Sequence, residues 1–221
     1  MNIAAIGSIE RLEELNFVLS LAGLSFTRFE STKNIINQKF DVIFDLNFDD
    51  RSHSISDYIG IQSETILFLS SVKIQLEAHI PSSLSNQVIG MNALPTFIKR
   101  DALECCVLNE KIDLSVVQML GWAKTNLVKS RVGLVSPRVI LMIINEAYFT
   151  LEEGTANRVD IDLGMKLGTA YPFGPFEWCD KIGINNVYES LVAIKNDSGD
   201  ERYKICNSLK TDYLKFKQNA C

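Results

Sequence analysis

The sequence predicts an α/β domain over residues 1–130, followed by an all-α domain over residues 131–221. In the first part, short apolar runs typical of buried strands alternate with segments of helical periodicity. From Val132 onward, the apolar residues follow helical spacing instead. Alternating strands and helices indicate an open parallel sheet, so two differently built domains are expected.

The chain begins with a predicted strand over residues 2–7 that ends at Gly7. Ser8 is a suitable N-cap for a helix whose apolar residues recur at helical spacing up to Gly23. Residues 25–30 form the second predicted strand. A strand, a helix and a strand in this order predict a parallel pair joined by a right-handed crossover.

The other elements of the first domain follow from short apolar runs and from helical spacing. Further strands are predicted over residues 41–48, 65–71, 87–91 and 103–108. Helices are predicted over residues 72–79 and 114–127. Short connections separate several of these segments, which favours neighbouring positions in one sheet.

The second domain opens with a long predicted helix. Ser136 is a natural N-cap, Pro137 suits the first helical turn, and Gly154 suits the C-terminal stop. Further helices are predicted over residues 161–167, 186–195 and 200–217. The run rich in proline and glycine over residues 167–183 is predicted to be a rigid turn that packs against the helices.

Composition and charge exclude several classes of function. Of the 221 residues, 47% are hydrophobic and 22% are charged, which is typical of a soluble globular protein. The net charge is −5 and there is no run of lysine and arginine, so no nucleic-acid partner is expected. No apolar run approaches the roughly 20 residues that span a bilayer, so no membrane partner is expected.

The cysteines and the first residues indicate a cytoplasmic protein. The five cysteines are odd in number and show no C-x-x-C spacing, which argues against a disulfide framework or a zinc site. The opening MNIAAIG lacks the basic region of a signal peptide. A reducing, cytoplasmic location without a metal site is therefore expected.

The block LEEGTANRVDIDLGMKLGTAYPFGPFEWCDKIG, with the NEA motif before it, closely resembles the C-terminal helical domain of 3-hydroxyacyl-CoA dehydrogenases. The family pattern combines NEA, LLEEG, a D-I-D helix and a P-x-G-P-F-E-x-x-D-x-x-G run. The matching residues are Asn145, Glu146, Ala147, Glu152, Glu153, Gly154, Asp160, Asp162, Gly168, Pro172, Gly174, Pro175, Phe176, Glu177, Asp180 and Gly183. So many matches in the same order make the resemblance specific.

The likeness extends weakly through the first domain. DVIFDLNFDD is similar to the family's acidic strand, TILFLSS to the strand before its serine-rich loop, and VIGMNALP to its G-L-H-F-F-N-P segment. The resemblance therefore implies a Rossmann-like nucleotide-binding fold over residues 1–130. The segment between Glu30 and Asp41 is too short for the strand and helices that family members carry there, so we expect a trimmed version.

The resemblance implies NAD as the cofactor, held at a glycine-rich turn whose backbone N–H groups bind the pyrophosphate. Gly7 matches the first glycine, but the second and third fall on Ile9 and Leu12. A β-branched Ile9 is expected to block the phosphate, and Glu10 adds negative charge there. Glu30 matches the acidic residue that binds the adenine ribose. We expect Gly7 and Glu30 to be relics of the cofactor site.

The resemblance also implies a histidine that removes the substrate's hydroxyl proton and a glutamate that orients this histidine. Here the histidine position falls on Asn92 and the glutamate position on Glu104. Asparagine forms hydrogen bonds but cannot accept a proton near neutral pH. The serine of the family's substrate loop corresponds to Ser71, or in an alternative register to Ser70.

Two further comparisons concern proline and histidine. The asparagine that opens the family's long C-terminal helix falls on Pro137, while the following Arg138 is kept. The pattern places neither His53 nor His79 near Asn92. Both histidines are expected to be satisfied locally or to face solvent.

Three hypotheses for function stay open. The first is a 3-hydroxyacyl-CoA dehydrogenase-like protein of fatty-acid and acyl-CoA metabolism that has degenerate sites and a binding or assembly role, which makes it a pseudoenzyme. The second is an active NAD-dependent oxidoreductase on a 3-hydroxyacyl-CoA-like substrate, with Glu104 as an altered acid–base group. The third is a dimeric interaction module, since the family's helical domain commonly forms its dimer contact and VILMIINEAYF is apolar on nearly all sides. The expected partners are an acyl-CoA-like ligand and a second copy bound through the helical domain.

Overall fold

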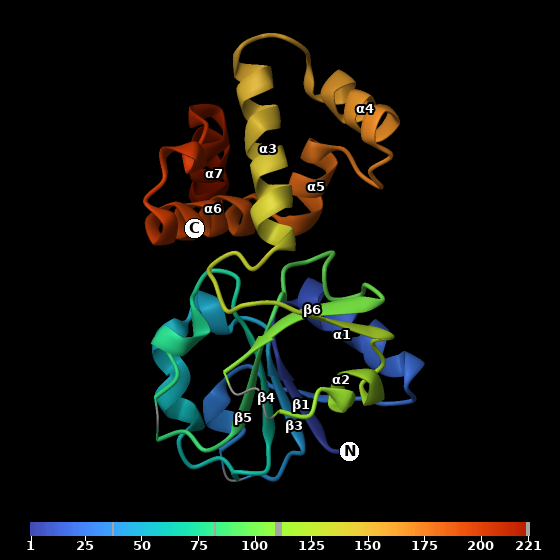
Figure 1. The fold of residues 1–221 in the computed structure, drawn as a ribbon, viewed down its shortest axis with the longest axis vertical. Coiled ribbons are helices and arrows are strands. Elements are labelled where there is room, and N and C mark those ends of the chain that lie inside the picture. The colour runs from blue at the N-terminus through green and yellow to red at the C-terminus, as the bar shows by residue number, and fades with distance from the viewer. Residues whose placement is uncertain (37, 82, 109–111, 220–221) are drawn as a thin grey trace. The chain divides into compact units, whose positions relative to one another are not determined.

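The computed structural model describes residues 1–36, 38–81, 83–108 and 112–219. The chain divides into two compact units, Met1–Leu134 and Val135–Cys221. The first unit is built around a sheet and the second is built from helices (Figure 1). Each unit is described below by itself.

A seven-stranded sheet forms the centre of the first unit, as far as its residues are described. Its strands are β1 (Ile3–Ile6), β2 (Thr27–Arg28), β3 (Val42–Asp45), β4 (Ile66–Ser70), β5 (Gln87–Met91), β6 (Ala102–Val107) and β7 (Lys124–Leu127). Their order is β2-β1-β3-β4-β5-β6-β7. All neighbours pair in parallel except β5 and β6, which are antiparallel. The predicted α/β class is confirmed.

The core of this unit lies between the sheet and helix α1 (Ile9–Leu21), which buries Leu12, Leu15 and Leu19. Burial of each such side chain contributes about 1.5–3 kcal/mol. On the sheet, the rings of Phe44 and Phe68 stack with centroids 4.8 Å apart. This packing fixes α1 against the strands and places its N-terminus at the carboxyl end of β1.

The sheet is trimmed on its β2 side. β2 has only two residues, and among the described residues the only regular element between β2 and β3 is the 3-10 turn η1 (Thr32–Asn34). The chain leaves β1 towards β2 on one side and towards β3 on the other. In open parallel sheets, ligands bind at such a reversal, outside the carboxyl ends of the strands.

The helix predicted over residues 72–79 is wrong. The segment after β4 contains only the 3-10 turn η4 (Leu76–Ala78). Val72, Ile74 and Leu76 are buried at alternate positions, which is the period of extended chain. The N–H groups of Val72 and Lys73 also bind the carboxylate of Asp49, so they are engaged outside any helix.

The helix predicted over residues 114–127 is also wrong in its second half. A short α2 (Ser115–Met119) is followed by strand β7, which pairs with β6. Gly121 separates them with a φ of +111°, and an added Cβ there would lie 2.3 Å from the carbonyl oxygen of Val18. Only glycine fits this close approach, so the chain turns away from the helix here.

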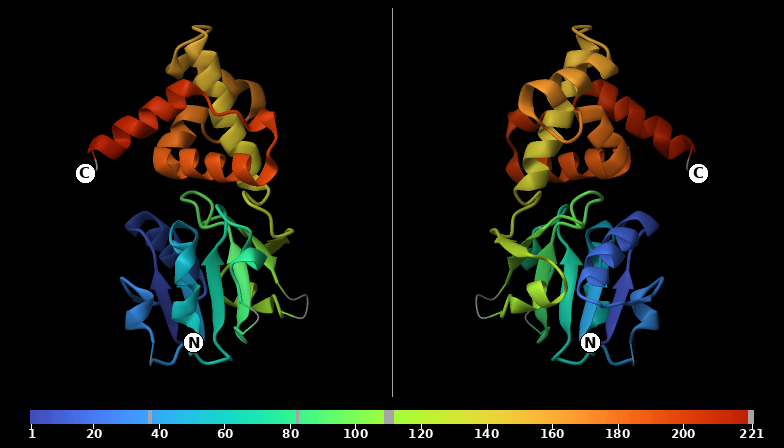
Figure 2. Two further views of the ribbon diagram at one scale, coloured as in Figure 1. Left: turned by 90° about the vertical axis from the view of Figure 1, so that its left-hand side faces the viewer. Right: turned by 90° about the vertical axis from the view of Figure 1, so that its right-hand side faces the viewer.

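The second unit contains helices and one 3-10 turn. The elements are α3 (Ser136–Glu152), α4 (Arg158–Thr169), α5 (Pro175–Ile182), α6 (Ile184–Ser198), η5 (Glu201–Tyr203) and α7 (Asn207–Asn219). Helix α3 runs through this unit and α7 projects from it (Figures 1 and 2). The predicted all-helical class is confirmed, and α3 begins with Pro137 in its first turn and ends before Gly154.

Two details of the helical unit differ from the prediction. The proline-rich run holds helix α5 where only a rigid turn was expected. The helix predicted over residues 200–217 is interrupted between η5 and α7. At this break, the Asn145 side chain donates to the Lys204 carbonyl at 2.9 Å and accepts from the Cys206 N–H at 2.9 Å, which replaces helical hydrogen bonds.

Asp162 holds the start of α5. Its carboxylate accepts the N–H groups of Phe176 at 2.8 Å and Glu177 at 3.1 Å, which are free donors of the first helical turn. Glu177 in turn accepts the Gly174 N–H at 3.0 Å. A Cβ on Gly174 would lie within 2.4 Å of Asp162, so glycine is required there. The family motif around these residues is therefore a packing device in this chain.

Helix α4 leaves its apolar side chains largely uncovered. Its only buried residue is Asp162. Val159 is 74% exposed, Leu163 50% and Leu167 78%. A helix that buries one carboxylate and exposes its aliphatic residues is unusual for a surface that faces solvent.

The remaining sequence expectations concern membranes, metals and cysteines. No helix among the described residues is long and apolar enough to cross a membrane. The described part holds no group of His, Cys, Asp and Glu arranged to bind a metal. Cys105, Cys106, Cys179 and Cys206 are free thiols, and Cys221 lies outside the described residues.

Candidate functional site at the carboxyl edge of the sheet

The glycine turn after β1 is packed by the chain that follows β3. An added Cβ on Gly7 would lie 3.1 Å from Cβ of Leu46, so this leucine rests directly on the turn. The Ser8 N–H donates to Oδ1 of Asn47 at 3.3 Å. Ser8 holds the N-cap position of α1 as predicted, but its own side chain makes no capping bond.

Arg11 fills the same region with a buried charge. Its side chain is only 2% exposed. Nη1 donates to the Leu46 carbonyl, to Oδ1 of Asn47 at 3.1 Å and to Oδ2 of Asp50 at 3.3 Å. Asp50 also pairs with Lys73. These contacts join the first turn of α1 to the loop after β3.

This arrangement does not fit a dinucleotide pyrophosphate. A pyrophosphate needs free N–H groups at the helix N-terminus and glycines that allow it to approach. Here Asn47 takes the Ser8 N–H and Leu46 packs on Gly7. The residues present therefore oppose the cofactor that the family resemblance implies.

The Ile9 side chain is 58% exposed in the first turn of α1, and its expected effect on a phosphate stays a prediction. Leu12 instead belongs to the core, at 5% exposure. Glu30 is exposed and follows the two-residue β2. The suggested ribose role of Glu30 stays a prediction.

A second buried network closes the loop between β3 and β4, which includes η2 (Phe48–Asp50) and η3 (Ser52–Tyr58). Asp45 is fully buried and accepts two bonds from Arg51, at 2.7 and 2.8 Å, and one from Tyr58 at 2.7 Å. Burial raises the pKa of Asp45 above its ordinary value, although Arg51 and Tyr58 oppose this. Burial also raises the pKa of Tyr58.

Sequence reasoning missed this acidic loop as a structural feature. Asp45, Asp49 and Asp50 all lie in DLNFDD, directly after a buried strand. Such a cluster predicts either a ligand site or an internal charge network. In the structure, Asp49 and Asp50 have partners on α1 and on the chain after β4, while Asp45 binds Arg51 and Tyr58 of the same loop.

The predicted Asn92–Glu104 pair is brought together at the carboxyl end of β5. Nδ2 of Asn92 donates to Oε2 of Glu104 at 3.2 Å, and the Asn92 N–H donates to the Glu104 carbonyl at 3.0 Å. Oδ1 of Asn92 accepts the Leu94 N–H at 3.3 Å. Asn92 is 1% exposed and Glu104 is 6% exposed. The amide thus joins two strands rather than facing solvent.

Glu104 also lies near a cation. Burial lowers the pKa of Arg100, while the carboxylates of Glu104 and Glu14 raise it. The Glu14 carboxylate accepts the N–H groups of Thr96 at 2.6 Å and Ile98 at 3.2 Å, which fixes the loop between β5 and β6. The Glu104 carboxylate therefore has Arg100 as a charged neighbour, and its side-chain donor at the family's histidine position is the amide of Asn92.

Ser71 faces a different neighbour. Its N–H donates to the Met91 carbonyl at 3.1 Å, beside Asn92 along the chain, but its Oγ lies 3.8 Å from Sγ of Cys106. An added Cβ on Gly90 would lie 2.6 Å from both of these atoms, so glycine makes room for them. Burial raises the pKa of the Cys106 thiol, which keeps it unreactive.

His79 has a local partner, while Arg138 binds residues far along the chain. Nδ1 of His79 lies 3.0 Å from the Gln75 carbonyl. His53 belongs to η3, and its side chain lies outside what the structure describes. Arg138 binds the Tyr203 hydroxyl at 3.0 Å and Asp197 at 3.1 Å.

Comparison with known proteins connects this geometry to a family. Residues 133–217 match the family described as 3-hydroxyacyl-CoA dehydrogenase, C-terminal domain. A 3-hydroxyadipyl-CoA dehydrogenase of Escherichia coli (strain K12) is 38% identical over 78 residues, which cover 35% of this chain and 16% of that protein. A probable 3-hydroxybutyryl-CoA dehydrogenase of Bacillus subtilis (strain 168) is 34% identical over 49% of this chain and 35% of that protein. The matches thus span about a third or less of these relatives.

Solved structures share the whole fold. The (S)-3-hydroxybutyryl-CoA dehydrogenase PaaH1 from Ralstonia eutropha has a TM-score of 0.71 at 17% identity, covering 95% of this chain and 92% of that chain. FadB2 of M. tuberculosis has a TM-score of 0.73 at 12% identity, with the same coverage. Together these findings define a Rossmann-like unit followed by the helical unit of a hydroxyacyl-CoA dehydrogenase fold. Residues 133–217 match the C-terminal domain of 3-hydroxyacyl-CoA dehydrogenases in sequence, and the solved structures share the fold of the whole chain.

Proposed function

We propose that this chain is a 3-hydroxyacyl-CoA dehydrogenase-like protein of acyl-CoA metabolism whose cofactor and catalytic sites are degenerate. It keeps a binding or assembly role, as a pseudoenzyme, in the cytoplasm. The observation that carries the proposal is the packing of Leu46, Asn47 and Arg11 at the Gly7 turn, where NAD would need free donors. The names of the matching relatives support the acyl-CoA setting.

The pair at the carboxyl end of β5 supports the same proposal. A neutral amide cannot take the hydroxyl proton, and Asn92 uses its two polar atoms on Glu104 and on the Leu94 N–H. Ser71 directs its hydroxyl towards Cys106 instead of towards this pair. An acyl-CoA-like ligand is the partner we propose for the retained fold.

Titration of NADH and NAD into the purified chain is expected to give no saturable signal in fluorescence or calorimetry up to millimolar concentration. The reason is that Asn47 accepts the Ser8 N–H, Leu46 packs on Gly7, and Asp50 already pairs with Arg11. Acetoacetyl-CoA reduction should be absent in the same preparation. The Ralstonia eutropha dehydrogenase serves as the positive control under identical conditions.

Saturable NADH binding and acetoacetyl-CoA reduction would instead favour an active NAD-dependent oxidoreductase with an altered acid–base group. That candidate has one specific observation in its favour, which is the buried contact between Asn92 and Glu104 at the position of the family's catalytic pair. NADH binding with turnover, abolished in Glu104→Gln, would establish it. Binding of acetoacetyl-CoA without NADH binding would instead support the proposal that the cofactor and catalytic sites are degenerate.

We also propose self-association through the helical unit, because α4 exposes Val159, Leu163 and Leu167. Two hollows flank α3 and share Ile143, one of about 320 Å³ towards α4 and one of about 520 Å³ towards Tyr203. Contiguous exposed apolar side chains of this kind mark interaction sites.

The charges around these hollows would be complementary between two copies of the chain. Asp160 borders the hollow next to α4, Arg138 and Arg202 border the other, and Glu146 borders both. In a two-fold dimer, each surface meets its own copy in reverse, so acidic and basic ends face one another. A homodimer is therefore the partner that we propose for this surface.

The variant Leu163→Glu with Leu167→Glu is expected to be a monomer, because four carboxylates would be buried in a two-fold contact. Light scattering after size exclusion should give about twice the 24.8 kDa chain mass for the natural protein. Leu214→Glu on α7, where the leucine is 48% exposed, is the matched control and should stay dimeric. A natural chain that runs as a monomer at 100-fold different loadings, from about 1 to 100 μM, would remove this proposal.

A further inference from the structure

The hollow of about 320 Å³ between α3 and α4 combines apolar side chains with two carboxylates, and we name it the α4 hollow. Helix α5 packs against both α3 and α4 and supplies Pro175 to the lining (Figure 1). The carboxylates are those of Glu146 and Asp160, which are both exposed. The other apolar residues of the lining are Ile143, Ala147, Ile161 and Met165. A lining of this kind suits a long aliphatic stem that carries a positive charge.

The walls of the α4 hollow are fixed by contacts between α4 and α5. Asp162 accepts the N–H groups of Phe176 and Glu177. Lys166 pairs with the Glu177 carboxylate, and Cζ of Arg158 lies 4.7 Å from the centre of the Phe176 ring. The hollow therefore exists before a partner arrives, which lowers the entropy lost on binding.

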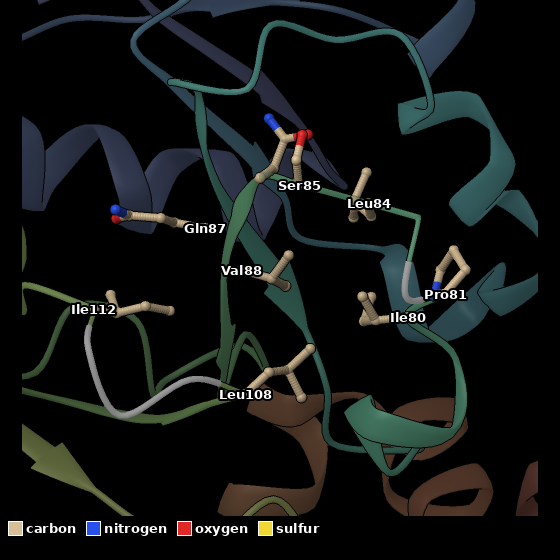
Figure 3. A pocket seen from close by; sticks show the side chains of 9 residues that line it. Ile80, Pro81, Leu84, Ser85, Gln87, Val88, Leu108 and Ile112 are labelled. Atoms are coloured by element: carbon tan, nitrogen blue, oxygen red, sulfur yellow. The ribbon is translucent and has the colours of Figure 1, made fainter.

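A pocket at the amino end of β5 differs from the α4 hollow in this respect. Figure 3 shows Leu84 and Val88 among the side chains that line this pocket. Its lining also includes Leu108 and Ile112, which flank residues 109–111 in the chain. These three residues lie outside the described part, so the charge of the pocket is not defined. Around the α4 hollow, every residue from 135 to 219 is described.

Arg202 is the cation that is available to a second copy. It borders the neighbouring hollow of about 520 Å³, and 67% of its side chain is exposed. Its Nε lies 3.3 Å from Oδ2 of Asp200, and an exposed pair of this kind contributes little energy. Arg138 is only 20% exposed and binds Asp197 and the Tyr203 hydroxyl. Arg202 can therefore exchange its carboxylate partner, while Arg138 is held in place.

We infer that Arg202 of a second copy enters the α4 hollow and pairs with Asp160 and Glu146. The inference rests on the proposed self-association and names the residues that decide it. The two hollows share Ile143 and Glu146, so a two-fold axis through these residues places each α4 hollow opposite the Arg202 hollow of the other copy.

This arrangement uses both parts of the arginine side chain. The aliphatic stem of Arg202 covers the apolar lining, and its guanidinium meets the carboxylates. The same contact occurs twice in the dimer. The two arginines also offset the two Glu146 carboxylates, which would otherwise face one another near the axis.

Charge reversal in the full chain tests the pairing. Arg202→Glu and Asp160→Arg should each raise the dissociation constant of the dimer at least about tenfold, since each variant turns two attractive contacts into repulsive ones. Light scattering over a dilution series measures this constant. An equimolar mixture of the two variants should return to the natural value, because both contacts of the mixed dimer again join opposite charges.

Two further variants and a salt series complete the design. Lys210→Glu on α7 makes the same change in net charge at an exposed residue outside both hollows, and should dimerise as the natural chain does. Arg202→Gln removes only the charge and should give a dissociation constant between those of the natural chain and Arg202→Glu. Raising NaCl from about 0.05 to 0.5 M should weaken the natural dimer, because salt screens exposed charges.

The outcomes separate this inference from self-association itself. A natural dimer that is unchanged in Arg202→Glu, or whose dissociation constant does not rise with salt, would overturn the pairing and leave self-association in place. A mixture that stays monomeric, although both variants melt at the natural temperature, would also overturn the pairing. A natural chain that is a monomer would overturn both proposals.

Discussion

Arg51→Met is expected to lower the free energy of unfolding by about 2–4 kcal/mol, which is less than for a fully buried pair because Arg51 is partly exposed. The change leaves the Asp45 carboxylate, which has no exposed surface, with only the Tyr58 hydroxyl and a backbone N–H as donors. Urea denaturation followed by circular dichroism measures the effect. The Arg51–Asp45 pair holds the loop that covers the Gly7 turn, so this loop should also become less ordered.

The double variant Arg51→Met with Asp45→Asn is the control, because it removes the charge as well as its partner. An asparagine at this position can still accept the Tyr58 hydroxyl, so the double variant should recover part of the loss. If Arg51→Met alone is as stable as the natural chain, the pair does not hold the loop.

The loss in Arg51→Met should depend on pH. Burial raises the pKa of Asp45 in the folded chain above its ordinary value of 3.8. A carboxyl whose pKa is raised by folding stabilises the fold at low pH, and this contribution is lost as pH rises through the folded pKa. Without the opposing charge of Arg51 the pKa rises further. The difference between the variant and the natural chain should therefore grow from pH 4 to pH 7.

Asp162→Ala is expected to cost about 2–4 kcal/mol, since it removes a helix cap and leaves two N–H groups of α5 without acceptors. The affected donors belong to Phe176, which is buried, and Glu177. Urea denaturation again provides the measurement, with loss of the Trp178 fluorescence environment as a second readout.

Asp160→Ala on the same helix is the matched control, because Asp160 is exposed and pairs only with Asn157 in the described contacts. Its loss should stay below about 1 kcal/mol. Equal effects of the two changes would mean that the D-I-D motif acts through helix α4 alone and not by capping α5.

The division into a sheet unit and a helical unit was predictable because hydrophobic periodicity changes at Val132. Strand β5 was located from a short apolar run alone. The segment after β4 was predicted wrongly: Val72 and Ile74 stand two residues apart, which is the period of extended chain, and the acceptor that holds it, Asp49, lies 23 residues earlier. Helix α5 was missed because its cap, Asp162, is supplied from 14 residues away.

The candidate site was also predictable from the sequence only in part. The proximity of Asn92 and Glu104 followed from the family pattern, since both stand on adjacent strands that the resemblance aligns. The contacts of Arg11 with Asn47 and Asp50 did not follow, because they join residues 36 and 39 positions apart that only the folded sheet brings together. An exposed Ile9 was unpredictable for the same reason.

Asn145 ties α3 to the chain that follows η5, over separations of 59 and 61 residues. Chains fold as they are synthesised from the N-terminus, and contacts distant in sequence close last. The Asn145 amide therefore reaches its two backbone partners only after Cys206 has been made. The helical unit should remain open to proteases and chaperones during translation, and become protected in one step when this last segment arrives.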